Sequence, residues 1–419
     1  MTRRMIDSGI EWIGEIPEDW QLVPARYLYK SNKKIVGFKE NEYERLSLTM
    51  KGVLKKSKYK SEGLQPSNFN SYQILNVNQL VFKLIDLQNV STSRVGISPY
   101  KGIVSPAYII IDRKNDSTNN KFYYYWYMSI YLNKVFNLLG DAGVRSNINS
   151  TELLDLKVPR INAKEQFKIS NALDIKCQKI EDIKSTIEKE IQTLEDYKKS
   201  IITEAVTKGL DKNVEMKDSG IEWIGEIPKH WEIKKGKYIL KLLKRTVRDD
   251  DEVITCFRDG IVTLRSNRRE DGFTFADQEI GYQGINKGDL VVHGMDGFAG
   301  AIGISDSRGK GSPVLNVLDS AENKWYLALY LRVMAYSDVF TALATGIRVR
   351  SVDLRWKKLS ELPYPVPPIG EQEEILRYIN KKFLNINRLI IKKRKQLETL
   401  EEYKKSLIYE YVTGKKEVE

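Results

Sequence analysis

The sequence predicts an α+β protein built as a tandem repeat, in which two mixed α/β domains are separated by a long antiparallel coiled coil formed within one chain. One observation that predicts it is a helix-favouring stretch, residues 163–206, which returns in similar form at residues 371–412. The other is a short segment, residues 7–17, which recurs without a change at residues 218–228 and is called the duplicated motif below. Each half of the chain therefore follows one plan, a globular segment and then a long helix.

The two helix-favouring stretches contain no Gly or Pro and are rich in Glu, Lys, Ile and Leu, a composition that favours helix. Aligned at an offset of 206 residues, their apolar positions coincide: Ile169 with Ile375, Ile180 with Ile386, Ile183 with Leu389, Ile191 with Leu397, Leu194 with Leu400 and Ile201 with Leu407. Such spacing predicts one apolar seam along a helix about 65 Å long. A narrow seam on a charged helix favours pairing of the two copies. The alternative is two separate surface helices, each lying on its own domain.

The first globular segment combines apolar runs at residues 73–84 and 106–112 with a predicted helix near residues 122–139, which is typical of an α+β domain. The second segment repeats its landmarks: Leu80-Val81 matches Leu290-Val291, Gly96-Ile97-Ser98 matches Gly303-Ile304-Ser305, and Ser105-Pro106 matches Ser312-Pro313. Between these landmarks the segments differ almost completely, which indicates one scaffold with two unlike surfaces. Trp20 and Trp231, which follow the two copies of the duplicated motif, predict an aromatic-anchored structural element.

Composition narrows the class of protein. With 419 residues, 41% of them hydrophobic, the chain is long enough for two or three globular domains. Cys177 and Cys256 have no partner pattern, which argues for a reducing compartment and against a disulfide framework or a zinc module. The N-terminus lacks the apolar core of a signal peptide, and no run approaches a membrane span. We therefore expect a cytoplasmic protein.

The net charge of +12 lies mainly in the globular segments. Residues 18–157 carry twenty basic and twelve acidic side chains, and residues 229–362 carry twenty-two and eighteen. The helical stretch at residues 163–208 is neutral, and the one at residues 371–412 has a charge of +3. Lys and Arg on a folded face bind phosphates by releasing condensed counterions, so a polyanion is the expected partner. The alternative is a basic protein without such a partner.

Antiparallel pairing of the two helices has a geometric consequence. It places the globular parts at opposite ends, related by an approximate two-fold axis that matches the dyad of a DNA duplex. We expect each part to recognise a short half-site, with the helix overlap setting the number of unread base pairs between them. The other hypotheses are a stand-alone sequence-specific DNA-binding protein and a basic coiled-coil scaffold without sequence preference.

The duplicated motif and the junctions before the helices carry a family resemblance. The first junction contains Val158-Pro159, Ile161, Glu165-Gln166 and Ile169, and the second contains Val366-Pro367, Ile369, Glu371-Gln372 and Ile375. Together with the paired helices they resemble the specificity subunit of type I restriction-modification enzymes, over essentially the whole chain. The first junction departs from the second in two ways: Arg160 stands where the second copy has Pro368, and two extra residues precede Glu165.

The resemblance implies a division of the chain into four parts. In this division residues 1–159 are a first target recognition domain with the duplicated motif, and residues 160–208 are a central spacer helix. Residues 209–365 are a second target recognition domain with the repeated motif, and residues 366–419 are a C-terminal spacer helix. The domains are implied to recognise the two halves of an asymmetric bipartite site on double-stranded DNA. The helices are implied to act as a ruler and to bind two methyltransferase (modification) subunits, which restriction/translocase subunits join. By this resemblance the chain carries no cofactor and catalyses nothing, because the methyl donor, ATP and magnesium belong to those partners.

The residues support the same absence of catalysis. The sequence has no Asn-Pro-Pro-Tyr or Asp-Pro-Pro-Tyr run of the kind that amino-methyltransferases use on a flipped base. The glycines between Gly303 and Gly311 do not have the spacing of a phosphate-binding loop. His230 and His293 are the only histidines and lack ligand spacing, so no metal site is expected. A nuclease centre built from scattered carboxylates stays open as an alternative.

Candidate DNA-binding residues fall into four sets of basic and polar side chains. The lysines near a Tyr in residues 50–60 are suited to bind phosphates. Arg and Asn side chains near residue 267 are suited to guanine and adenine edges. The Gly-started loops before each helix are suited to a contact with the DNA backbone that both heads share. The candidates are Lys51, Lys55, Lys56, Lys58 and Lys60; Thr92, Ser93 and Arg94; Arg265, Asn267, Arg268 and Arg269; and Arg145, Arg348 and Arg350. Solvated charge or pairing with helix carboxylates is the alternative.

Repeated polar and aromatic positions on the helices and junctions are the candidates for binding the methyltransferase. They are Gln166, Tyr197, Gln372 and Tyr403. For the two tyrosines, packing within the coiled coil is the alternative.

Overall fold

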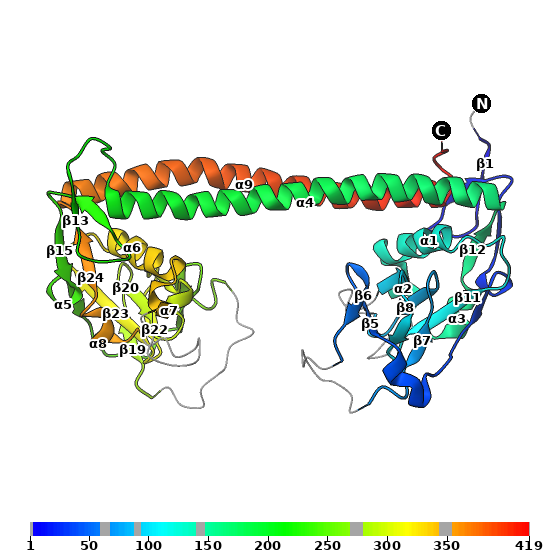
Figure 1. Ribbon diagram of the computed structural model, residues 1–419, viewed down its shortest axis with the longest axis horizontal. Helices are drawn as coiled ribbons and strands as arrows, with labels where there is room; N and C mark the ends of the chain where they lie inside the picture. The colour runs from blue at the N-terminus through cyan, green and yellow to red at the C-terminus, as the bar shows by residue number, and fades with distance from the viewer. Residues whose placement is uncertain are drawn as a thin grey trace. The chain divides into compact units, whose positions relative to one another are not determined.

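The computed structural model describes residues 3–58, 68–87, 94–139, 147–268, 280–342 and 354–418 (Figure 1). It divides into two compact units, Met1–Ile187 with Arg394–Glu419, and Glu188–Lys393. Each unit holds one globular part, called the first head (residues 21–160) or the second head (residues 232–366). Each also holds a length of both long helices, α4 (Ala163–Lys208) and α9 (Ile369–Val412).

The first head contains two four-stranded sheets. One is antiparallel, in the order β4 (Tyr29–Ser31), β11 (Ile109–Arg113), β8 (Leu80–Lys83) and β9 (Arg94–Ile97). The other has the order β6 (Gly52–Lys56), β5 (Arg45–Thr49), β10 (Gly102–Val104) and β7 (Gln73–Leu75). Strand β3 (Gln21–Pro24) pairs with β12 (Lys157–Arg160), which leads into α4. The helical elements are η1 (Ala25–Tyr27), η2 (Gly37–Glu42), α1 (Asn120–Leu132), α2 (Val135–Leu139) and α3 (Ser150–Asp155).

The second head repeats this plan with a smaller second layer. Its main sheet has the order β16 (Leu240–Leu242), β23 (Leu315–Ser320), β20 (Leu290–His293) and β21 (Ile302–Ile304). Two antiparallel pairs join β17 (Ile254–Cys256) to β18 (Val262–Leu264), and β19 (Gln283–Ile285) to β22 (Gly309–Gly311). Strand β15 (Glu232–Lys235) pairs with β24 (Pro363–Val366). The helices are α5 (Gly236–Ile239), η3 (Gly297–Ala299), α6 (Lys324–Tyr336), α7 (Val339–Ala342) and α8 (Trp356–Leu359).

The predicted landmark matches occupy equivalent places in the two main sheets. Val81 on β8 pairs with Gly96 on β9, and Val291 on β20 pairs with Gly303 on β21. Each sheet is covered by a helix with an asparagine N-cap: the Asn119 side chain accepts the N–H groups of Lys121 and Phe122 in α1, and the Asn323 side chain accepts the N–H of Trp325 in α6. The two heads are therefore two versions of one fold.

In each unit the duplicated motif and the two residues before it form a two-stranded sheet beside a long helix. The first sheet pairs β1 (Met5–Asp7) with β2 (Glu15–Pro17), and the second pairs β13 (Met216–Asp218) with β14 (Glu226–Pro228). The Trp that follows is buried in both copies. The indole N–H of Trp20 donates to Glu165 Oε1 at 3.2 Å, and that of Trp231 donates to Glu371 Oε2 at 3.0 Å. These bonds tie each motif to the first turn of a long helix.

Each unit also holds the far end of the other long helix against its motif. In the first unit α9 ends at Val412, and Gly414 follows with a φ of +72° that favours glycine; an added Cβ there would meet Pro17 Cγ at 2.5 Å. In the second unit α4 ends at Lys208, and Gly209 follows with φ +73°; an added Cβ there would lie 3.3 Å from Trp231. The start of one helix thus lies beside the end of the other in both units, which confirms antiparallel pairing.

The seam between α4 and α9 follows an alternating spacing of three and four residues. On α4 the half-buried and buried positions include Ile180, Lys184, Ile187, Ile191, Leu194, Lys198 and Ile201. Three half-buried lysines reach carboxylates of the facing helix: Lys184 pairs with Glu401, while Lys404 Nζ lies 2.6 Å from Glu181 and Lys393 Nζ lies 2.6 Å from Glu190. Lys198 instead pairs with Glu195 of its own helix. Polar groups at such positions fix the register of a coiled coil.

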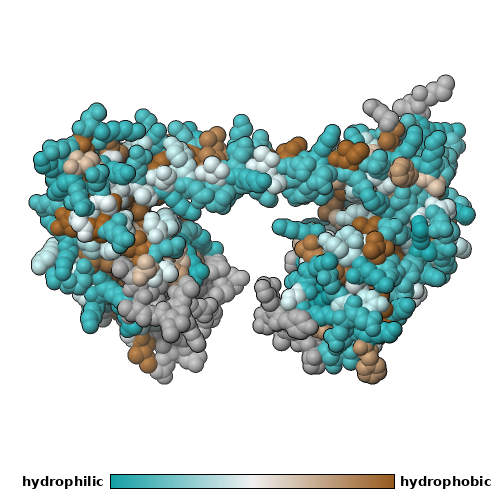
Figure 2. All heavy atoms as spheres, viewed as in Figure 1, coloured by the Kyte–Doolittle hydropathy of each residue, from teal (hydrophilic) through white to brown (hydrophobic). Residues whose placement is uncertain are grey.

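Two of the predicted seam residues are not in the seam. Ile183 is 48% exposed and Leu389 is 49% exposed, because the three-and-four spacing assigns the seam to the neighbouring Lys184 and Ile390. The remaining predicted pairs are buried or partly buried. Figure 2 shows apolar side chains along the outer surface of the long helices, among otherwise polar ones.

We expect Ile386→Ala to destabilise the protein by about 2–4 kcal/mol, because Ile386 is only 6% exposed in the core of the second unit. Leu389→Ala, three residues away on the same helix, should change the free energy of unfolding by less than about 0.5 kcal/mol. Urea unfolding of the full chain, followed by circular dichroism, measures both. Equal losses for the two variants would contradict the observed seam.

Candidate nucleic-acid interface

The two largest predicted basic sets lie on equivalent hairpins of the two heads. In the first head, Lys51, Lys55 and Lys56 lie on the β5–β6 hairpin, and Lys58 follows it. In the second head, Arg265, Asn267 and Arg268 directly follow β18 of the β17–β18 hairpin. The two hairpins correspond because each turns a pair of buried, directly opposed side chains toward the core of its head. The pair is Leu48 and Val53 in the first head and Cys256 and Val262 in the second.

The first hairpin carries flexible ammonium groups beside aromatic rings. Lys55 Nζ lies 2.6 Å from Glu44 and 5.2 Å from the centre of the Tyr100 ring. Its hydrogen bond to Glu44 raises the pKa of Lys55 above its ordinary value. Lys58 donates to the Glu40 carbonyl at 2.5 Å, whereas Lys51 and Lys56 are exposed to solvent. This composition suits phosphate oxygens.

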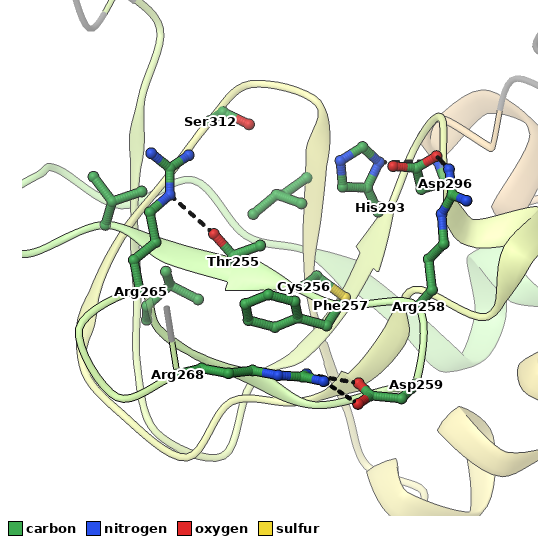
Figure 3. A pocket seen from close by; sticks show the side chains of 13 residues that line it. Thr255, Cys256, Phe257, Arg258, Asp259, Arg265, Arg268, His293, Asp296 and Ser312 are labelled. Atoms are coloured by element: carbon green, nitrogen blue, oxygen red, sulfur yellow. Dashed lines mark hydrogen bonds and ion pairs between the residues drawn. The ribbon is translucent and has the colours of Figure 1, made fainter. Parts of the chain in front are cut away.

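The second hairpin carries guanidinium groups that have hydrogen-bond partners within the same head (Figure 3). Arg268 Nη1 and Nη2 donate to the two oxygens of Asp259 at 3.0 and 2.6 Å, and its guanidinium lies 4.2 Å from the centre of the Phe257 ring. Arg265 Nε donates to Thr255 Oγ1 at 3.1 Å. Asn267 Nδ2 donates to Thr263 Oγ1 at 3.0 Å, which fixes the orientation of its amide.

These side chains border a depression of about 660 Å³ in the second head, lined on its other side by His293, Asp296 and Arg258. Figure 3 shows His293 and the Arg258–Asp296 pair across the depression from Arg265. The Arg258 Nη2–Asp296 Oδ1 distance is 2.9 Å. The depression therefore presents several N–H donors, a chemistry suited to the acceptor atoms of nucleic acid rather than to a covalent reaction.

His293 is held as one neutral tautomer. Its Nδ1 accepts the backbone N–H groups of Met295 at 3.2 Å and Asp296 at 3.0 Å, so the ring proton resides on Nε2. Burial lowers the pKa of His293 below its ordinary value of 6.5. The charge of Asp296 raises this pKa, and the charge of Arg258 lowers it.

One basic residue of the first head escaped the sequence-based prediction. Lys83 on β8 lies directly opposite Arg94 on β9, and burial together with the charge of Arg94 lowers the pKa of Lys83. Like charges opposed across a sheet destabilise it unless an anion or a carboxylate lies near. Only the strand register brings these two residues together, so no sequence pattern singles out Lys83.

The predicted partner-binding residues divide into two kinds. Gln166 and Gln372 are buried: Gln166 Oε1 accepts the Asn119 N–H at 2.7 Å, and Gln372 Oε1 accepts the Asn323 N–H at 2.9 Å. Their side-chain N–H groups donate to the carbonyls of Ile161 and Pro367, both at 2.9 Å. Tyr197 and Tyr403 are 51% and 52% exposed and form the accessible part of the set.

Several predicted DNA-binding residues lie outside the described residues. They are Lys60, Thr92, Ser93, Arg145, Arg269, Arg348 and Arg350. Within the described ranges, no group of three or more His, Cys, Asp or Glu side chains is arranged to hold a metal ion. Over the same ranges no helix combines the length and apolar character that a membrane span needs.

Comparison with known proteins finds relatives along nearly the whole chain. No family model matches the chain. It is 23% identical over 439 residues to a putative type I restriction enzyme specificity subunit (MjaX) of Methanocaldococcus jannaschii, covering 96% of this chain and 95% of that one. It is also 26% identical over 238 residues to the type I restriction enzyme MjaVIII specificity subunit of the same organism, covering 54% and 50%.

A solved structure shares the fold. It comes from work on complex assembly and conformational transition of the type I restriction-modification system, and matches with a TM-score of 0.65 at 10% identity, covering 95% of this chain and 98% of that chain. The fold thus defines a protein of two α/β heads joined by long antiparallel helices. Over nearly its whole length the chain is thus similar to a specificity (S) subunit of a type I restriction-modification system, and it shares its fold with a structure from such a system.

We expect the stability of the protein to fall as the pH drops below about 6.5, because the lowered pKa of folded His293 means that the unfolded chain binds the proton more readily. The stabilising contribution is fully present above pH 6.5 and is lost as the pH falls toward the folded pKa. His293→Asn keeps an acceptor near the two backbone N–H groups and should flatten this dependence. Thermal unfolding of both proteins between pH 7.5 and 5.5 tests it, and identical slopes would contradict the assignment.

Proposed function

We propose that the chain selects an asymmetric, bipartite sequence on double-stranded DNA, with one half-site recognised by each head. One observation carries this proposal: equivalent hairpins on two heads of one fold carry unlike basic side chains, lysines in the first and planar, fixed arginines in the second. A protein that merely coats DNA has no need for this difference. The same proposal retains the division into residues 1–159, 160–208, 209–365 and 366–419 as two target recognition domains and two spacer helices.

In this proposal the long helices are both ruler and assembly surface. The seam lysines and their carboxylate partners support a fixed helix register, which a ruler requires. Two methyltransferase (modification) subunits bind along the helices, with Tyr197 and Tyr403 as accessible contacts, and restriction/translocase subunits join that complex. The predicted DNA-binding residues form the DNA-facing surface of each head.

Protection footprinting of the full chain with its methyltransferase subunits on a random-sequence duplex pool tests the proposal. Two short protected patches with a constant unprotected gap are expected. Uniform coverage instead indicates a basic scaffold without sequence preference. Equally tight and selective binding by the chain alone indicates a stand-alone DNA-binding protein.

A second prediction concerns the ruler. We expect deletion of residues 188–194 together with 391–397 to shorten the gap between half-sites by about three base pairs, since seven residues span about 10 Å of helix. This deletion removes the paired Glu190 and Lys393 together. Mapping the methylated positions produced by the assembled complex measures the gap. An altered half-site with an unaltered gap would refute the ruler.

A further inference from the structure

We infer that Arg268, held by Asp259 and Phe257, is a guanine-recognising residue of the second head, whereas the equivalent hairpin of the first head binds phosphates. The inference rests on the proposed function and specifies its chemistry. It names one base type in the second half-site and two positioning residues, Asp259 and Phe257.

The geometry fixes the plane of the guanidinium. Stacking at 4.2 Å on the Phe257 ring limits tilting, and the two hydrogen bonds to Asp259 limit rotation within the plane. A guanidinium has five N–H groups, of which Asp259 accepts two, one from each terminal nitrogen. The edge formed by Nε and the adjacent nitrogen is suited to donate two parallel hydrogen bonds. That pattern matches the O6 and N7 acceptors of guanine in the major groove.

The charge of Asp259 distinguishes a base edge from a phosphate. A carboxylate within 3.0 Å neutralises the guanidinium and repels a phosphate brought to the same place. A neutral base edge meets no such repulsion. The pair is also accessible, because the Arg268 and Asp259 side chains are 37% and 45% exposed.

The rest of the interface provides two contrasts. Arg258 faces the same depression and also has a carboxylate partner, Asp296, but through one hydrogen bond to its Nη2 group. Lys56 on the first hairpin is exposed and offers a rotatable point charge. Neither side chain has a fixed plane, so neither is expected to select a base.

The test uses Arg268→Lys in the full chain assembled with its methyltransferase subunits. Bound duplexes are selected from a random pool and sequenced, and affinities for the selected site and its single-base variants are measured over a range of salt concentrations. Arg268→Lys keeps the charge but loses the planar donor edge. We expect the preference for one G·C pair in the second half-site to fall by roughly 5- to 100-fold, with the first half-site and the salt dependence unchanged.

Matched controls use the same readouts. Arg258→Lys, the same substitution in the same depression, should leave every base preference intact. Lys56→Ala should reduce the salt dependence and change no base preference. Asp259→Asn removes the neutralising charge, so it should weaken the guanine preference while increasing the salt dependence, a combination that misfolding does not produce.

The outcomes separate this inference from the proposed function. A wild-type complex that selects no two-part site refutes the proposed function itself. A two-part site whose second half keeps its full base preference in Arg268→Lys overturns the guanine assignment alone.

Discussion

The arrangement of each unit depends on the hydrogen bonds at the first turn of its long helix. Glu165 and Glu371 accept buried indole N–H groups, and the next residue, Gln166 or Gln372, accepts the backbone N–H of the residue that caps the head helix. These polar groups are largely withdrawn from water, so each bond left unmade would cost about 1–3 kcal/mol. The duplicated motif, the head helix and the long helix are therefore held as one body. This constraint gives a physical reason for the identity of the motif and of the Glu-Gln pair in the two repeats.

The pairing of the long helices relies on a mixed seam rather than on a continuous apolar one. Lysines occupy seam positions and reach carboxylates on the facing helix, while isoleucines fill the intervening positions. Exposed pairs of this kind contribute little stability individually. Their value lies in discriminating between registers, because a shifted register would leave a lysine against apolar side chains. The proposed role of the helices as a spacer depends on this discrimination more than on extra stability.

The heads differ most where the scaffold permits it. The buried face of the hairpin is similar in both, with Leu46, Leu48 and Val53 in one head and Ile254, Cys256 and Val262 in the other. The outward side chains carry no packing constraint and differ completely. A longer turn in the second head brings Asp259 and Phe257 to Arg268, whereas the short turn in the first head provides no counterpart. One fold can thus carry two chemically distinct recognition surfaces.

The sequence by itself determined the tandem repeat, the two long helices and their antiparallel pairing, because identity and the spacing of apolar residues are properties of the linear chain. It also located the two basic hairpins by composition. The tertiary structure alone decided which side chains meet. The 206-residue alignment identified equivalent positions in the two helices rather than facing ones, so Ile183 and Leu389 were assigned to the seam although they are exposed. Strand register placed Lys83 opposite Arg94, burial enclosed Gln166 and Gln372, and turn length joined Arg268 to Asp259. Each of these contacts joins residues whose proximity is fixed by packing, and packing has no signature in a single sequence.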